Sequence, residues 1–244
     1  MIIWRSHCGP MALLLPAVLA CGHGSRPPAL GVSAEAAAEA AVPVYQEPRH
    51  RLVFQDSLVR VLDVRMAPGD TSAYHVHAAP LVGVVIQDAR TWTQSRGAPP
   101  GPVQPPQAIP SVFENWSRAL PYTHRVANAD TVPLHYVVAE WLAPSGQRGP
   151  ALPDGPGRRL LKGGPTTRVY EISLAPGAVT DAHTHPAPGL TVLATAGSLA
   201  VEGDAPQAEA GTGAGSWSWR GAGFRHVLRN DGPTPLIIYE VDWR

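Results

Sequence analysis

The chain has 244 residues, a formal net charge of zero and a single lysine, Lys162. The balance of acidic and basic residues gives no sign of a basic patch that could bind the phosphate backbone of a nucleic acid, so we expect no nucleic-acid partner. The 27 prolines and 24 glycines indicate many turns and irregular connections, and favour a β-rich protein over a helical one.

Residues 1–21 predict a signal peptide. Arg5 precedes a short apolar run, Met11–Ala20, which is shorter than the roughly 20 residues of a membrane-spanning helix. Val18–Cys21 resembles a bacterial lipoprotein cleavage box, with Leu19 larger than usual. We therefore expect a bacterial protein that is exported, either to the periplasm or as a membrane-anchored lipoprotein. A lipid on Cys21 would be its only membrane attachment.

The rest of the chain predicts four segments. Residues 22–44 are rich in Gly, Ser, Pro and Ala, and suggest a flexible tether. A β-rich region follows over 45–142, then a Pro- and Gly-rich linker over 143–157 and a second β-rich region over 158–244. Strands are expected at 59–66, 81–86, 134–141, 168–174, 190–193 and 236–243, which is typical of a small barrel or a jelly roll.

The two β-rich regions are copies of each other. A shift of 108 residues aligns Ala67–Gly69 with Ala175–Gly177 and superposes two His-x-His pairs. Beyond the central loop the shift becomes 102, and it aligns the segments that carry a third histidine. The first copy has six extra residues, which we place in the Pro-rich stretch 95–110. The pattern indicates an internal duplication with one expanded loop.

The repeated histidines predict two metal sites. Two histidines at i and i+2 on a strand project from one face, and a third from a neighbouring strand can complete a three-nitrogen site. A metal could occupy one site or both, and the alternative is that these histidines only form hydrogen bonds inside a barrel. The candidate metal ligands are His75, His77 and His124 in the first copy, and His183, His185 and His226 in the second.

Other polar residues are weaker candidates. Asn128 and Asn230 follow the third histidine of each copy, and we expect them to bond the backbone rather than a metal. His50 and His135 have no counterpart in the other copy, and we expect surface or structural roles for both.

These motifs resemble those of the cupin superfamily, and the chain after the tether looks like a bicupin. The resemblance implies an all-β fold of two tandem cupin barrels, also called double-stranded β-helix or jelly-roll barrels. The first copy matches less completely, because Ala119 and Pro121 replace a proline and a glycine of the second motif. The matching residues of the second copy are Gly177, His183, His185, Gly197, Gly215, Gly223, His226 and Asn230.

The chain departs from the usual cupin pattern at the acidic ligand. Where cupins usually carry glutamate, the first copy has Leu81 or Val82 and the second has Gly189 or Leu190. Both sites then resemble the three-histidine subset, which includes thiol dioxygenases and diketone-cleaving dioxygenases. Three neutral ligands leave a divalent ion with its full charge, and so favour an anionic or bidentate substrate. Replacement acids are weakly suggested at Glu114 and Glu202.

Two functions remain open at this stage. One is a metal-dependent enzyme of the dioxygenase type, which acts on a small metal-chelating substrate and has no catalytic residue assigned beyond the metal ligands. Fe(II) is the first expectation for its metal, with Mn, Ni, Cu or Zn also suited to imidazole. The other is a non-catalytic exported cupin protein that holds a small ligand or a metal.

Overall fold

A computed structural model describes residues 40–147, 149–164 and 166–244. The predicted signal peptide and most of the predicted tether lie outside these residues. At the end of the tether, however, Val42 and Pro43 pair with His75 and Val76, so they belong to the first barrel. No helix in the described ranges has the length and apolar character needed to cross a membrane.

The first half contains ten short elements. Its two sheets have the strand orders β2-β3-β9-β5-β7 and β1-β4-β8-β6. The elements are β1 (Val42–Pro43), the 3-10 helix η1 (Val44–Gln46), β2 (His50–Gln55), β3 (Val59–Met66), β4 (His75–His77), β5 (Leu81–Gln87), β6 (Thr91–Ser95), β7 (Ser111–Glu114), β8 (Tyr122–Asn128) and β9 (Leu134–Trp141).

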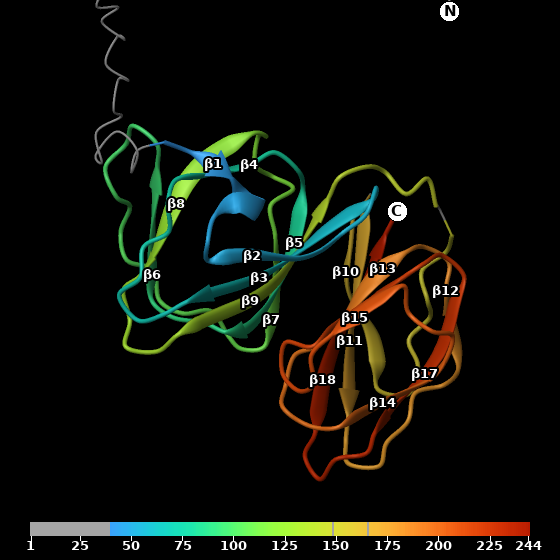
Figure 1. Ribbon diagram of the computed structural model, residues 1–244. Helices are drawn as coiled ribbons and strands as arrows, with labels where there is room; N and C mark the ends of the chain where they lie inside the picture. Colours follow the sequence, from blue (N-terminus) through green and yellow to red (C-terminus); the bar gives the residue numbers. More distant parts are fainter. Residues whose placement is uncertain (1–39, 148, 165) are drawn as a thin grey trace, which may run out of the picture. The chain divides into compact units, whose positions relative to one another are not determined.

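The second half, whose strands are labelled in Figure 1, repeats most of this plan: β1 and η1 have no counterpart there, and β15 has none in the first half. Its sheets have the orders β10-β11-β18-β13-β16-β15 and β12-β17-β14. Its strands are β10 (Arg158–Gly163), β11 (Thr167–Leu174), β12 (His183–His185), β13 (Gly189–Leu193), β14 (Leu199–Gly203), β15 (Ala208–Ala210), β16 (Trp217–Arg220), β17 (Phe224–Asn230) and β18 (Leu236–Trp243).

The sheet register repeats together with the strand order. Arg60 on β3 lies opposite Glu140 on β9, and Arg168 on β11 lies opposite Asp242 on β18. The predicted all-β fold of two tandem jelly-roll barrels is therefore confirmed. Three of the six expected strands have the predicted bounds, and the other three differ by one residue at one end. The Pro-rich stretch forms the connection between β6 and β7.

Apolar residues on alternate strand positions form the cores. On β3, Leu62, Val64 and Met66 point into a cluster inside the first barrel, while Val59 and Val61 contribute to a different cluster. This alternation follows from the two-residue period of a strand. The second barrel has its own interior cluster. These cores fix the strands that carry the histidines.

Candidate metal centres

The first cluster brings together the three predicted histidines of the first half. His75 and His77 lie on β4, and His124 on β8 lies directly opposite His75 in the ladder. Each can offer a ligand atom within 4.8 Å of the others. The Nδ1 atom of His75 lies 3.0 Å from the carbonyl oxygen of Ala73, which leaves its Nε2 atom for the cluster.

Two buried ring nitrogens in this cluster, His75 Nε2 and His124 Nδ1, lack hydrogen-bond partners within the described part of the chain. Such orphaned atoms cost free energy, and they are rare in folded proteins unless an ion or water satisfies them. Burial lowers the pKa of all three histidines, to about 3 for His75 and about 2 for His124. The imidazoles are therefore neutral at neutral pH, which is the form that binds a metal. The donor set fits a divalent transition metal.

The neutral histidines predict acid sensitivity of the metal-free protein. Below pH 6.5 an unfolded chain protonates its histidines, whereas folded His75 and His124 stay neutral until about pH 3 and about pH 2. The unfolded state thus binds more protons, and the free energy of unfolding falls as the pH falls below 6.5. We expect a lower urea midpoint at about pH 5.5 than at about pH 7.5. An unchanged midpoint across this interval would show that these rings are not held neutral.

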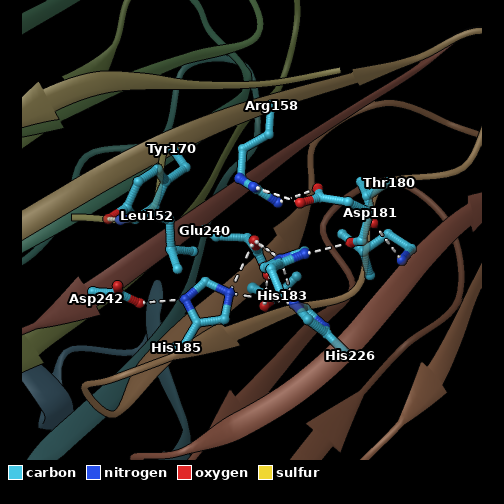
Figure 2. A network of polar contacts seen from close by, with 12 residues as sticks. Leu152, Arg158, Tyr170, Thr180, Asp181, His183, His185, His226, Glu240 and Asp242 are labelled. Atoms are coloured by element: carbon cyan, nitrogen blue, oxygen red, sulfur yellow. Dashed lines mark hydrogen bonds and ion pairs between the residues drawn. The ribbon is translucent and has the colours of Figure 1, made fainter. Parts of the chain in front are cut away.

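The second cluster contains four residues rather than three. His183 and His185 lie on β12, and His226 on β17 lies opposite His183. The Nε2 atom of His226 lies 2.9 Å from that of His183 and 3.2 Å from that of His185. Glu240 on β18 completes the group, and Figure 2 shows its carboxylate among the three rings.

The ligand atoms of the second cluster have the spacing of a metal site. Glu240 Oε2 lies 3.3 Å from His183 Nε2 and 3.2 Å from His185 Nε2, and Oε1 lies 3.1 Å from His226 Nε2. Metal–ligand bonds of about 2.1 Å place neighbouring donors about 3.0 Å apart in an octahedron and about 3.4 Å apart in a tetrahedron. The observed separations agree with these values, so the donor set fits a metal with little rearrangement.

Glu240 is held as a carboxylate. Burial alone would raise its pKa, but the neighbouring charge of His185 and the hydrogen bonds from the three histidines hold that pKa well below its usual value. The hydroxyl of Thr191 donates a further hydrogen bond of 3.1 Å to Oε1. An ionised carboxylate is the form that can bind a cation.

Glu240 departs from the expectation that neither site contains an acid. Gly189 and Leu190 do stand at the usual position of the cupin glutamate, but the acid comes from the last strand instead. The signal was present in the sequence, since Glu240 and Asp242 both lie on one face of an otherwise apolar strand. The suggested replacements join neither cluster: Glu202 pairs with Arg229, and Glu114 accepts a hydrogen bond from Thr167.

The first half has no acid at the equivalent position. In the sheet ladder Glu240 lies opposite Thr191, and in the first half Val138 lies opposite Gly83. Val138 is therefore the counterpart of Glu240. The first cluster consists of histidines alone, beside an apolar wall.

Each half uses another acid to orient its second histidine. Asp242 Oδ1 lies 2.7 Å from His185 Nδ1, and Arg220 donates a 2.6 Å hydrogen bond to the same oxygen. In the first half Glu140 Oε1 lies 3.4 Å from His77 Nδ1. These contacts direct the Nε2 atom of each ring toward its cluster, as carboxylates commonly do for metal-binding histidines.

Gly189 makes room for this arginine. A Cβ atom at position 189 would lie 2.1 Å from Arg220 Nη1 and 2.2 Å from the carbonyl oxygen of Val241. We expect Gly189→Ala to lower the free energy of unfolding by about 2 kcal/mol or more, because neither the buried guanidinium nor the backbone can move away freely. Urea denaturation measures this change. Gly163→Ala is the control, because its Cβ would meet only Leu160 at 3.7 Å; equal effects of the two substitutions would refute the explanation.

A cavity of about 360 Å³ opens onto the first cluster. Its wall is mainly apolar, and it includes Leu81, Phe113 and Val138. Its polar lining includes His50, His77, Glu114, Asn115, Arg118, Tyr122 and His124, so the suggested acid Glu114 borders the cavity without joining the cluster. A second cavity, of about 300 Å³, lies in the other half, and none of the four second-cluster residues borders it. Of these two cavities, the first borders a histidine cluster and the second does not.

The remaining predictions have mixed outcomes. Asn128 and Asn230 bond the backbone as expected, with Nδ2 atoms 2.8 Å from the carbonyl oxygens of Val132 and Thr234. His135 has the expected structural role, since it contacts Asp63 at 2.9 Å. His50 is buried rather than on the surface, its Nδ1 atom lies 2.7 Å from Glu47 Oε2, and it also borders the first cavity.

Comparison with known proteins gives a fold and no close relative. No family model matches the chain, and no curated protein matches it. Among solved structures, AerE from Microcystis aeruginosa has a TM-score of 0.54 at 11% identity, covering 81% of this chain and 98% of AerE. An oxalate decarboxylase has a TM-score of 0.51 at 12% identity, covering 77% and 69%.

A third similar structure is a variant of salicylate 1,2-dioxygenase from Pseudoaminobacter salicylatoxidans. Its TM-score is 0.50 at 13% identity, and the match covers 76% of this chain and 70% of that one. The neighbours are cupin-fold proteins and include a dioxygenase and a decarboxylase. At this level of identity the similarity establishes the shared fold.

Proposed function

We propose that this chain is a metal-dependent enzyme of the dioxygenase type, and that its first half holds the active site for a small metal-chelating substrate. One observation carries the proposal: the three-histidine cluster opens into a mainly apolar cavity. Both features are needed for catalysis on a small molecule, because a working metal keeps open positions and its ligand must reach them.

The ligands of the first site favour an anionic substrate. His75, His77 and His124 are neutral, so they leave the charge of a divalent ion uncompensated. Val138 adds no charge where the second half has Glu240. The apolar wall excludes water and so strengthens the attraction between the site and a negatively charged chelating group.

Fe(II) is the first choice for the metal, with Mn, Ni, Cu or Zn as alternatives, because imidazole suits all of them. When bound, the ion would supply Lewis acidity and a template for the reactants. The chain would hold the ligands in place: Glu140 contacts His77 and in turn accepts a 2.7 Å hydrogen bond from Arg60.

We assign a structural metal to the second half. Its cluster has four buried protein ligands, and the second cavity borders none of them. Four protein ligands without an open position are typical of metals that stabilise a fold. We also propose that the protein is exported from a bacterial cell, with Cys21 as the only lipid attachment point.

A non-catalytic binding protein is the second candidate. The closed second cluster favours it, because that half is built to retain an ion rather than to exchange ligands. In this case the first half would hold a metal with a chelating ligand and release it unchanged.

Oxygen uptake separates the two candidates. The protein is loaded with Fe(II) under argon, mixed with a panel of catechols, β-diketones and 2-hydroxy acids, and then exposed to oxygen in an electrode cell. The enzyme proposal predicts uptake with at least one compound that also binds in the absence of oxygen. Binding without uptake across the panel and across the five metals would favour the binding protein.

A further inference from the structure

We infer that His50, held by Glu47, is a substrate-binding residue of the first site and accepts a hydrogen bond at Nε2 from an O–H group of the bound molecule. This inference rests on the proposed location of the active site. It adds a residue that does not bind the metal, and it narrows the substrate class.

Glu47 fixes the orientation of the His50 ring. Its carboxylate is 1% exposed, and Oε2 lies 2.7 Å from His50 Nδ1. The same oxygen accepts a 2.7 Å hydrogen bond from the backbone N–H of Arg49, and Oε1 accepts a 3.1 Å hydrogen bond from that of Ala73. Both carboxylate oxygens are therefore engaged, and the carboxylate cannot turn without breaking several hydrogen bonds.

This contact also selects the tautomer of His50. An ionised carboxylate only accepts hydrogen bonds, so the proton of a neutral His50 ring resides on Nδ1. The two backbone N–H groups that also donate hydrogen bonds to Glu47 favour its ionised form. The Nε2 atom of His50 is left with its lone pair, ready to accept a hydrogen bond.

His50 lies beside the metal ligands and borders the cavity. Its ring centroid is 4.4 Å from that of His75 and 6.4 Å from that of His77. The cavity lining includes His50 together with His77 and His124. A molecule held at the three-histidine cluster would therefore have His50 as its neighbour. Glu47 links His50 to the metal ligand His75 through Ala73. The backbone N–H of Ala73 donates a hydrogen bond to Glu47, and the carbonyl oxygen of Ala73 contacts His75 Nδ1.

The second half has no such pair. In the ladder His50 lies opposite Val64, and the corresponding residue opposite Ile172 is Arg158. Arg158 donates a 2.9 Å hydrogen bond to Asp181 and lies in the half whose cluster does not border the second cavity. The Glu47–His50 pair therefore occurs in the half where a small molecule can reach the histidines.

The cavity indicates which molecules would use this acceptor. Its size and apolar wall suit a compact apolar body rather than a sugar or a nucleotide. Arg118 borders it and supplies a positive charge, since it helps to lower the pKa of His77 and His124. Glu114 also borders the cavity, but its carboxylate accepts a hydrogen bond from Thr167 and lies 3.9 Å from Lys162 Nζ. We therefore propose a small 1,2-dioxygenated compound, such as a catechol monoanion, with one oxygen ionised and the other still carrying its proton.

The test uses 4-nitrocatechol as the probe and Co(II)-loaded protein, because both absorb visible light that changes on binding. His50→Phe keeps an aromatic ring but removes the acceptor, and His50→Gln is a second variant of similar length. We expect the dissociation constant for 4-nitrocatechol to rise about tenfold or more in both, equivalent to about 1.4 kcal/mol. Glu47→Gln should also weaken binding, because the tautomer is no longer imposed.

Two controls separate binding from structure. Azide has no O–H group, so its affinity for the cobalt-loaded protein should be the same in wild type and in the His50 variants. His135→Gln is the matched control variant, because His135 also pairs with a carboxylate but does not border the cavity. Its affinity for 4-nitrocatechol should equal that of wild type.

The outcomes are distinguishable. If the wild type takes up no metal at the first cluster, the proposed active site is wrong. If the wild type binds 4-nitrocatechol and both His50 variants bind it equally well, the inference about His50 is overturned. Loss of metal or of azide binding in both variants would also overturn it, and would assign His50 to the support of the ligands.

Discussion

The His124→Ala variant is expected to lose both the first metal ion and all substrate-dependent oxygen uptake. His124 is the only first-half ligand from β8, so its removal leaves two imidazoles from one short strand. Two ligands are too few for the three-nitrogen set on which the open site depends. We expect uptake to fall at least about 100-fold, which corresponds to the loss of about 2.7 kcal/mol of transition-state stabilisation.

The matched variant is His226→Ala, at the equivalent position of the second half. It should lose the second metal ion but keep oxygen uptake, measured at a temperature where it stays folded. The reverse pattern, with activity lost in His226→Ala and retained in His124→Ala, would show that the active site lies in the second half and would refute the proposed location.

The Glu240→Gln variant is expected to lose the second metal ion and to melt at a lower temperature than wild type. The substitution keeps the shape of the side chain but removes the charge that faces three imidazoles. The amide also places N–H donors among the Nε2 atoms of the three histidines, whose lone pairs would bind the metal. Removing one partner of a buried charged group typically costs about 3–5 kcal/mol. Differential scanning calorimetry and metal analysis measure both effects.

Glu202→Gln is the control for this variant, because Glu202 lies on the surface of the same half and pairs with Arg229. Exposed ion pairs contribute little, so its melting temperature should stay close to that of wild type. A Glu240→Gln protein with full metal content and unchanged melting temperature would show that the second cluster is not a metal site.

The sequence predicted the fold because the duplication repeats its physical signals. The apolar alternation in strands such as Val59–Met66 and Leu236–Trp243 predicts the first and last residue of each strand correctly. The i and i+2 spacing in His183–His185 places both rings on one face, so a third ring opposite them completes the cluster. These are local patterns with a period of two, and they can be recognised in the sequence without knowing the tertiary contacts.

The difference between the two halves was not predictable in the same way. Glu240 and Val138 reach the clusters from the last strand of each half, about 55 residues or more after the His-x-His pair along the chain. Their roles depend on which face of a distant strand meets the histidines, which only the sheet register reveals. The role of His50 depends likewise on Glu47, whose carboxylate is positioned by tertiary contacts.

One fold therefore supports two different sites. In the first half, Val138 leaves the three histidines beside an open cavity, and in the second half Glu240 closes the equivalent set. The substitution Val138→Glu, which copies Glu240 into the first half, would add a fourth protein ligand to the first cluster. The difference between the sites lies in a few inward-facing residues, while the order of the eight shared strands and the register of the histidines are the same in both halves.

The metal content of the purified chain is the decisive test of the two proposed metal sites. Protein isolated without a nickel affinity step, reconstituted with Fe(II) and freed of unbound ions, should contain two ions per chain by mass spectrometry of the elements. The double variant His75→Ala/His77→Ala and the double variant His183→Ala/His185→Ala should each contain one. A wild-type chain that retains no ion, with iron or with any of the other four metals, would contradict the account.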